Sequence, residues 1–172
     1  MRMAIVEDLP SERLKLETML TRYGAERSVK FQILPFDSGK AFLDARPEGI
    51  DLVLIGIERA AVNGMETARR MREYDSRAQL IFVTHLVQYA IEGYGVNAVD
   101  FLVKPVAYPA LCAAMDRALA RIRAMAPRFL MTGYARETVS CRIQEITCIE
   151  SLNRKTLIHM LDGTVLPSSE PL

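Results

Sequence analysis

The sequence predicts an α/β protein: a parallel sheet with helices on both faces, followed by a small all-β segment. Three observations lead to this prediction. Short apolar runs alternate with helical patterns five times up to about residue 126. Two of these runs, residues 52–57 and 80–84, are almost continuously apolar, as expected of parallel strands covered on both faces. After Pro127 the helical pattern gives way to short strand-like runs separated by turn residues.

Local signals near the N-terminus predict the first strands and helices. Residues 3–6 are expected to form a strand, and Ser11 is expected to cap the helix that follows it. Residues 31–36 are expected to form the second strand. Because proline cannot donate to a strand ladder, Pro35 places this strand at an edge of the sheet. Ser38 is expected to cap a short second helix.

The same alternation predicts the rest of the first domain. In chain order we expect a central strand at 52–57, a helix carrying Met65, Ala68 and Met71, a strand at 80–84, a weaker helix at about 88–94, a strand at 101–103 and a last helix beginning near Pro109. Such β-α units imply right-handed crossovers between parallel strands. Ligands of these sheets bind at the carboxyl ends of the strands.

Polar residues fall at these strand ends. They are Glu7 and Asp8 after the first strand, Thr84 at the end of the fourth and Lys104 after the fifth. Paired acids suit a hard cation such as Mg²⁺. A lysine ammonium can hold an incoming phosphoryl group, and a hydroxyl can bond it. We expect the bond between Lys104 and Pro105 to be cis, aiming the lysine into the same pocket.

Composition excludes several classes of protein. Of the 172 residues, 50% are hydrophobic and 25% are charged, which is typical of a globular protein, and the net charge is +1. Bulk charge therefore gives no case for nucleic acid or membrane binding. Three cysteines without metal-ligand spacing are expected to be reduced thiols. Because no secretory segment or membrane-spanning run is found, we expect a cytoplasmic protein without membrane contact.

The predicted domains are residues 1–126 and 127–172. In the second, strands are expected at 129–131, 138–142, 146–149 and 155–161. From Arg128 onward this segment has five basic and five acidic residues, so its net charge is 5 − 5 = 0. Because non-specific DNA affinity depends on neutralising phosphates, the segment by itself offers little of it.

Several motifs together resemble a known family. They are Val53-Leu54-Ile55-Gly56-Ile57-Glu58, Asn63-Gly64-Met65-Glu66-Thr67-Ala68, Ile81-Phe82-Val83-Thr84, Tyr89-Ala90-Ile91-Glu92-Gly93-Tyr94 and Asp100-Phe101-Leu102-Val103-Lys104-Pro105. The first domain resembles a response-regulator receiver that precedes a LytTR DNA-binding domain, and residues 128–172 resemble the beginning of such a LytTR domain. The resemblance implies a flavodoxin-like (βα)5 sheet with strand order 2-1-3-4-5.

The resemblance also implies roles for individual residues. Glu7 and Asp8 match the family's metal-binding acids, Thr84 its switch hydroxyl, Lys104 its conserved lysine and Phe101 its switch aromatic. Gly56 stands where the family has its phospho-acceptor aspartate, and Glu58 matches the position whose carbonyl completes the metal site. The polar residues Asn153, Arg154 and Lys155 match a loop that contacts DNA.

The missing carboxylate limits the chemistry. Asp51 lies about 16 Å from Gly56 along an extended strand, and on the opposite face, so it cannot replace the acceptor. Glu58 lies beyond the end of the strand, and we expect its side chain to point elsewhere. Without a carboxylate at position 56, Mg²⁺ affinity is expected to fall. Simpler alternatives are that Glu7 and Asp8 only cap a helix, that Lys104 is solvated and that residues 153–155 form a solvated turn.

These observations predict a non-enzymatic, atypical response regulator of the LytTR type. It would act in phosphorelay signal transduction and transcriptional regulation without phosphorylation of its own. Its expected partners are a histidine kinase, another response regulator or a second copy bound through the receiver, and DNA only if the output domain is completed beyond residue 172. The alternative is an interaction decoy or dimerisation module for a full-length regulator or kinase, without DNA binding. A self-phosphorylating receiver is a third hypothesis, which Gly56 opposes.

Overall fold

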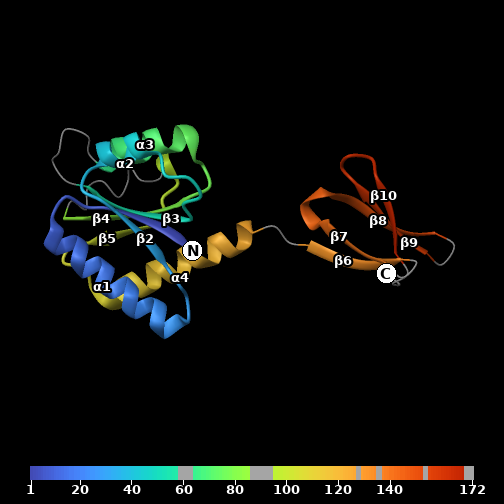
Figure 1. The fold of residues 1–172 in the computed structure, drawn as a ribbon, viewed down its shortest axis with the longest axis horizontal. Helices are drawn as coiled ribbons and strands as arrows, with labels where there is room; N and C mark the ends of the chain where they lie inside the picture. The colour runs from blue at the N-terminus through green and yellow to red at the C-terminus, as the bar shows by residue number, and fades with distance from the viewer. Residues whose placement is uncertain (58–63, 86–94, 127–128, 135–136, 153–154, 169–172) are drawn as a thin grey trace. The chain divides into compact units, whose positions relative to one another are not determined.

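A computed structural model describes residues 1–57, 64–85, 95–126, 129–134, 137–152 and 155–168 (Figure 1). The chain divides into two compact units, Met1–Ala124 and Met125–Leu172. The helix predicted at about residues 88–94 lies outside the described residues.

The first unit is a parallel sheet covered by helices on both faces. Its strands are β1 (Arg2–Val6), β2 (Gln32–Phe36), β3 (Leu52–Ile57), β4 (Gln79–Thr84) and β5 (Asp100–Val103), in the order β2-β1-β3-β4-β5. Its described helices are α1 (Pro10–Arg27), α2 (Gly39–Ala45), α3 (Gly64–Tyr74) and α4 (Tyr108–Met125). The predicted fold class and strand order are therefore confirmed.

The core consists of two layers, one on each face of the sheet. Helices α1 and α4 pack on one face, and α2 and α3 pack on the other (Figure 1). Successive side chains of β3 serve both layers: Leu52 and Leu54 join the first, and Val53 and Ile55 join the second. All four side chains are fully buried. This double coverage explains why the run is apolar without alternation.

Local signals explain most of the element boundaries. Pro35 lies in β2 at the edge of the sheet, as predicted. The Ser38 side chain accepts a hydrogen bond from the Ala41 N–H and caps α2, also as predicted. The prediction that Ser11 caps α1 is wrong, because the N-cap is Leu9, two residues earlier, and the helix begins at Pro10. Pro10 occupies the first helical turn, where its fixed φ favours a helix start.

The second unit consists of short antiparallel strands. It contains β6 (Phe129–Tyr134), β7 (Glu137–Arg142), the 3₁₀ turn η3 (Ile143–Glu145), β8 (Ile146–Leu152), β9 (Lys155–Met160) and β10 (Val165–Ser168). β6 pairs with β7, and a separate sheet has the order β10-β9-β8. The sequence did not predict β10, which is short and includes Pro167. Proline is tolerated there because β10 lies at the edge of its sheet.

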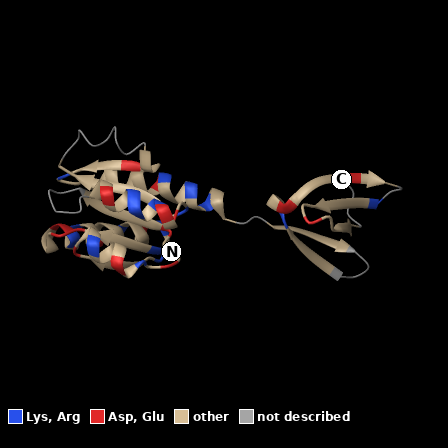
Figure 2. Ribbon diagram, turned by 90° about the horizontal axis from the view of Figure 1, so that it is seen from above, with Lys and Arg blue, Asp and Glu red and all other residues tan. Residues whose placement is uncertain are grey.

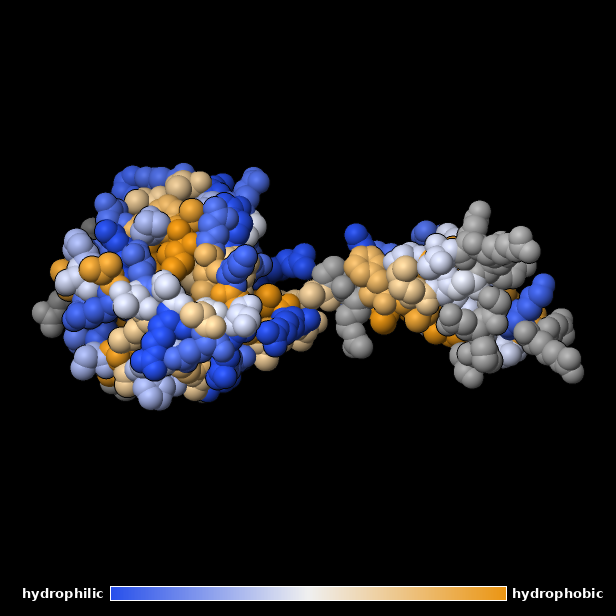
Figure 3. All heavy atoms as spheres, turned by 60° about the horizontal axis from the view of Figure 1, so that its bottom comes forward, coloured by the Kyte–Doolittle hydropathy of each residue, from blue (hydrophilic) through white to orange (hydrophobic). Residues whose placement is uncertain are grey.

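The surfaces of both units combine acidic, basic and apolar side chains. Figure 2 shows basic and acidic residues interspersed along the helices of the first unit. Figure 3 shows apolar atoms among hydrophilic ones on both units. The exposed large side chains of the second unit include Phe129, Met131 and Leu152. In the part of the chain that the structure describes, no helix is long and apolar enough to cross a membrane.

Candidate functional site

The predicted site residues come together at the carboxyl edge of the parallel sheet. Glu7 follows β1, Gly56 lies in β3, Thr84 ends β4 and Lys104 follows β5. The strand register aligns these positions, with Ile55 beside Val6 and the backbone of Ile57 beside Thr84. The Lys104 N–H donates to the carbonyl oxygen of Thr84 at 2.9 Å, which ties the ends of β4 and β5 together.

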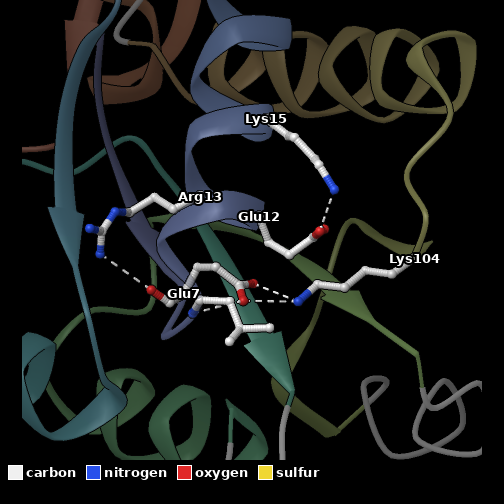
Figure 4. Close-up of polar contacts among 6 residues, drawn as sticks. Glu7, Glu12, Arg13, Lys15 and Lys104 are labelled. Atoms are coloured by element: carbon white, nitrogen blue, oxygen red, sulfur yellow. Dashed lines mark hydrogen bonds and ion pairs between the residues drawn. The ribbon is translucent and has the colours of Figure 1, made fainter.

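A buried ion pair occupies the centre of this site. The Lys104 ammonium lies 2.9 Å from Glu7 Oε1 and 2.8 Å from Glu7 Oε2, and each side chain is only 1% exposed (Figure 4). The alternative of a solvated Lys104 is therefore wrong. Charge-assisted hydrogen bonds of this length are among the strong ones in proteins. The ammonium neutralises the carboxylate inside the protein, where water does not reach either group.

The glycine at position 56 is closely surrounded. A Cβ atom on Gly56 would lie 2.8 Å from Glu7 Oε2 and 3.4 Å from the carbonyl oxygen of Val6. A Cβ on Gly64, at the start of α3, would clash with the carbonyl oxygen of Gly56. The carboxylate of Glu7 thus fills the space where a side chain at position 56 would begin.

Neighbouring groups hold the Glu7 segment in place. The Leu9 N–H donates to Glu7 Oε1 at 3.4 Å, and the Arg13 guanidinium donates to the backbone carbonyl of Glu7 at 3.4 Å (Figure 4). The pKa of Glu12 is lowered, first by its hydrogen bond from Lys15 and further by nearby positive charges that include Lys104. Asp8 is exposed to solvent. No side chain caps α1, so the capping alternative for Glu7 and Asp8 is not observed.

The two switch positions predicted from the resemblance lie in the neighbouring strands β4 and β5. Thr84 is buried at the end of β4. Phe101 in β5 is half-buried and stacks on Phe82, with ring centroids 4.8 Å apart. The peptide bond between Lys104 and Pro105 is cis, as predicted.

Neither acid considered as a replacement for the acceptor is found at the site in the described residues. Asp51 lies at the opposite end of β3, where its Oδ2 accepts a hydrogen bond from the Arg2 N–H at 2.8 Å. Glu58 lies outside the described residues, as do Asn153 and Arg154. Lys155 begins β9 and is exposed.

The donor set does not match a divalent cation. Of the two acids predicted to bind metal, Glu7 is paired with Lys104 and Asp8 is exposed to solvent. Gly56 has no side-chain oxygen to add to them. Across the described ranges, no cluster of three or more His, Cys, Asp or Glu is placed to hold a metal ion. Hard cations such as Mg²⁺ require several oxygen ligands. The donors among the described residues therefore do not fit the cation that the resemblance implied.

Comparison with known proteins identifies the first unit. The model of the response regulator receiver domain matches residues 3–116. The chain belongs to the response regulator receiver family. The positive alginate biosynthesis regulatory protein of Pseudomonas aeruginosa is 28% identical over 118 residues, covering 69% of this chain and 47% of that protein. The sensory transduction protein LytT of Bacillus subtilis is 27% identical over 105 residues, covering 61% and 42%.

A solved receiver supports the same fold. The response regulator protein TrrA from Thermotoga maritima, solved in complex with Mg(2+)-BeF, superposes with a TM-score of 0.58 at 24% identity, covering 68% of this chain and 97% of that one. The chain spans about half the length of the curated relatives it matches. It is a two-component receiver whose relatives are named as regulators of transcription and sensory transduction.

One feature of the receiver pocket was not predicted from the sequence: the Glu7 carboxylate occupies the space above Gly56. Two signals in the sequence bear on it. The acid at position 7 is a glutamate, whose side chain is long enough to reach across to the next strand. The neighbouring position in that strand, β3, is Gly56, and glycine has no side chain.

Proposed function

We propose that this protein is an atypical response regulator of the LytTR type that acts without phosphorylation of its own. The observation that supports this proposal is the pocket at Gly56. Position 56 itself supplies no carboxylate to attack a phosphoryl donor, and Glu7 Oε2 lies 2.8 Å from the place of the missing Cβ. Glu7 itself is 1% exposed and paired with Lys104, so it is a poor nucleophile for a donor arriving from solvent.

Weak binding of Mg²⁺ is part of the same proposal. A receiver cation needs carboxylate ligands, and of the described acid pair Asp8 is exposed whereas Glu7 is buried. The Lys104 ammonium already neutralises Glu7. Adding a second cation beside Lys104 would be opposed by like-charge repulsion. This pocket therefore lacks the acceptor carboxylate and binds Mg²⁺ only weakly, so it does not support the phosphoryl transfer of an ordinary receiver.

The second unit is proposed as a partial LytTR output domain over residues 127–172. Its support is the antiparallel strand pattern of β6 to β10 and the similarity of the first unit to LytT. Lys155 is exposed at the start of β9 and directly follows the proposed DNA-contacting residues Asn153 and Arg154 in the sequence. Because the unit carries no net positive charge, DNA binding would depend on further output sequence.

The first experiment tests phosphorylation directly. The protein is incubated with acetyl phosphate and MgCl₂, and its intact mass is measured, with the LytT protein of Bacillus subtilis as the parallel sample. We expect no phosphoryl adduct on this chain. A stoichiometric adduct would overturn the proposal. A gel shift with candidate promoter repeats tests the regulatory half, and absence of binding by a stable dimer at low salt counts against it.

A second candidate function is a protein-interaction module without DNA binding. It is favoured by β8, which lies at the edge of its sheet and has six exposed residues out of seven. An open strand edge can pair with another chain. The partner would be a histidine kinase, a full-length response regulator or a second copy bound through the receiver. Co-purification with a cognate kinase or regulator supports this candidate, whereas monomeric behaviour in their presence contradicts it.

A further inference from the structure

Two groups of polar contacts join α1 to α4 on one face of the sheet. In the first, the Tyr23 hydroxyl donates to Asp116 Oδ1 at 2.6 Å, and the Arg27 guanidinium donates to Asp116 Oδ2 at 3.0 Å. In the second, the Tyr108 hydroxyl donates to Glu26 Oε2 at 2.7 Å. Because Tyr108 is the first residue of α4, the contacts hold both ends of its first half to the last two turns of α1.

The geometry of each helix supports these contacts. The Arg22 guanidinium lies 4.0 Å from the centre of the Tyr108 ring, and its Nε donates to Glu26 Oε1 at 2.8 Å. The hydrogen bond from Tyr23 is the main cause that lowers the pKa of Asp116. The pKa of Glu26 is lowered first by Arg22 and then by Tyr108. Both acceptors therefore remain carboxylates at neutral pH.

Burial divides α4 into two parts. The residues that face the core are Leu111, Ala114, Met115, Ala118 and Leu119. Among residues 120–125, which we call the exposed end of α4, Ile122 alone is not exposed. The chain enters the second unit through this end, at Met125. Because a short helical segment with little packed surface is marginal in water, the exposed end depends on how firmly the first half is held.

We propose that the contacts between the two helices form a latch that controls the exposed end of α4. Its members are Arg22, Tyr23, Glu26 and Arg27 from α1, with Tyr108 and Asp116 from α4. The latch is closed in this structure. When it opens, the buried residues keep the first half of α4 on the sheet, and the exposed end frays.

The exposure of the latch suits a device that opens and closes. Its two ion pairs have side chains that are between 46% and 64% exposed. Exposed pairs are individually weak, so they can break without unfolding of the sheet. The latch includes neither Gly56 nor Lys104, and this inference therefore does not rest on the proposed function.

Hydrogen exchange of the full chain, measured by mass spectrometry, tests the latch. The double variant Tyr23→Phe/Tyr108→Phe removes both donating hydroxyls and keeps both rings. The matched control is Tyr74→Phe on α3, which removes a hydroxyl outside the latch. In the double variant we expect exchange of amides 120–125 to rise about fivefold or more, and that of β3 and β4 to change less than about twofold. The control should leave α4 unchanged.

Two outcomes would overturn the latch. Unchanged exchange at residues 120–125 would show that the hydroxyls do not hold the exposed end. An equal rise in β3 and β4 would show a general loss of stability instead of local opening. Neither outcome touches the proposed function, which fails only in its own experiments.

A double-mutant cycle tests the contact between Tyr23 and Asp116 directly. Tyr23→Phe and Asp116→Ala break the same hydrogen bond. Combining them should therefore speed exchange of the exposed end by no more than about 1.5-fold over the faster single variant. Effects that multiply fully would show that the two residues act independently, and would overturn the latch.

Trypsin gives a second measurement of the exposed end. Arg121 and Arg123 are exposed there, and the protease cleaves after them only where the helix opens. Cleavage at these two sites should be about fivefold or more faster in Tyr23→Phe/Tyr108→Phe than in the unchanged protein or in Tyr74→Phe. Equal cleavage of all three proteins would contradict control of this segment by the latch.

Discussion

The two units of this protein each hold an acidic side chain 2.8 Å from a basic one, in very different surroundings. In the first unit, Glu7 and Lys104 are each 1% exposed. In the second, Glu150 and His159 are 50% and 31% exposed. The two pairs therefore contribute differently to stability at the same separation, because water screens the second pair and not the first. Burial, more than geometry, decides which charged contacts shape this molecule.

The strands of the two units differ in the same way. All six residues of β4 are buried, whereas six of the seven residues of β8 are exposed. The first unit has helices on both faces of its sheet, and the second has no described helix longer than the single turn η3. Substitutions should thus have large effects in the first unit and small ones in the second.

The largest expected effect comes from breaking the buried ion pair. Lys104→Met leaves the Glu7 carboxylate buried without its ammonium, and removing one partner of a buried pair destabilises proteins by about 3–5 kcal/mol. Urea denaturation monitored by circular dichroism measures the loss. The matched control is Lys155→Met at the exposed first residue of β9, which should change stability by less than about 0.5 kcal/mol. Similar losses in both variants would refute the contrast between the units.

The next largest effect is expected from truncating a buried leucine of the first unit, compared with an exposed leucine of the second. Leu54 in β3 is fully buried, and Leu152 in β8 is 54% exposed. Leu54→Ala should cost about 2–5 kcal/mol, because it removes buried methyl groups and leaves a cavity in the layer between β3 and helices α1 and α4. Leu152→Ala should cost less than about 0.5 kcal/mol. A large loss for Leu152→Ala would show that β8 is covered in the protein as it exists in solution.

Much of this architecture could be predicted from the sequence, because burial on both faces leaves a continuous apolar run. That signal located β3 and β4, and Pro35 placed β2 at the edge. The start of α1 was wrongly assigned because the fixed φ of Pro10 outweighed the capping preference of Ser11. The strand β10 was missed because four residues that include Pro167 give almost no periodic signal.

The candidate site was predictable in its members and not in its contacts. Strand ends of a parallel sheet meet at one edge, so Glu7, Thr84 and Lys104 could be grouped without coordinates. The pairing of Glu7 with Lys104 joins residues 97 positions apart, and it depends on side-chain length and direction. Nothing in the local sequence around Gly56 specifies that the carboxylate of Glu7, the residue after β1, fills its space.

A pH titration sharpens the comparison within the first unit. Burial, and then the hydrogen bond to Asp116, raises the pKa of Tyr23 to about 12. The folded protein therefore keeps a proton that the unfolded chain releases near its ordinary pKa of 10.0. The stabilisation is complete below about pH 10 and is lost as the pH rises from about 10 to 12. Melting temperatures across this range should fall more steeply for the unchanged protein than for Tyr23→Phe, and identical slopes would contradict the assignment.

The smallest expected effect concerns the exposed acid of the second unit. Glu150→Gln keeps the shape of the side chain and removes its charge, while the contact with His159 remains open to water on both sides. Exposed pairs of this kind contribute about 0–1 kcal/mol, so urea denaturation should show a loss below about 0.5 kcal/mol. Glu7→Gln is the counterpart at the same 2.8 Å separation, and its loss should be several times larger because Lys104 has no access to water. Equal losses at the two glutamates would mean that distance, rather than burial, sets the strength of these pairs.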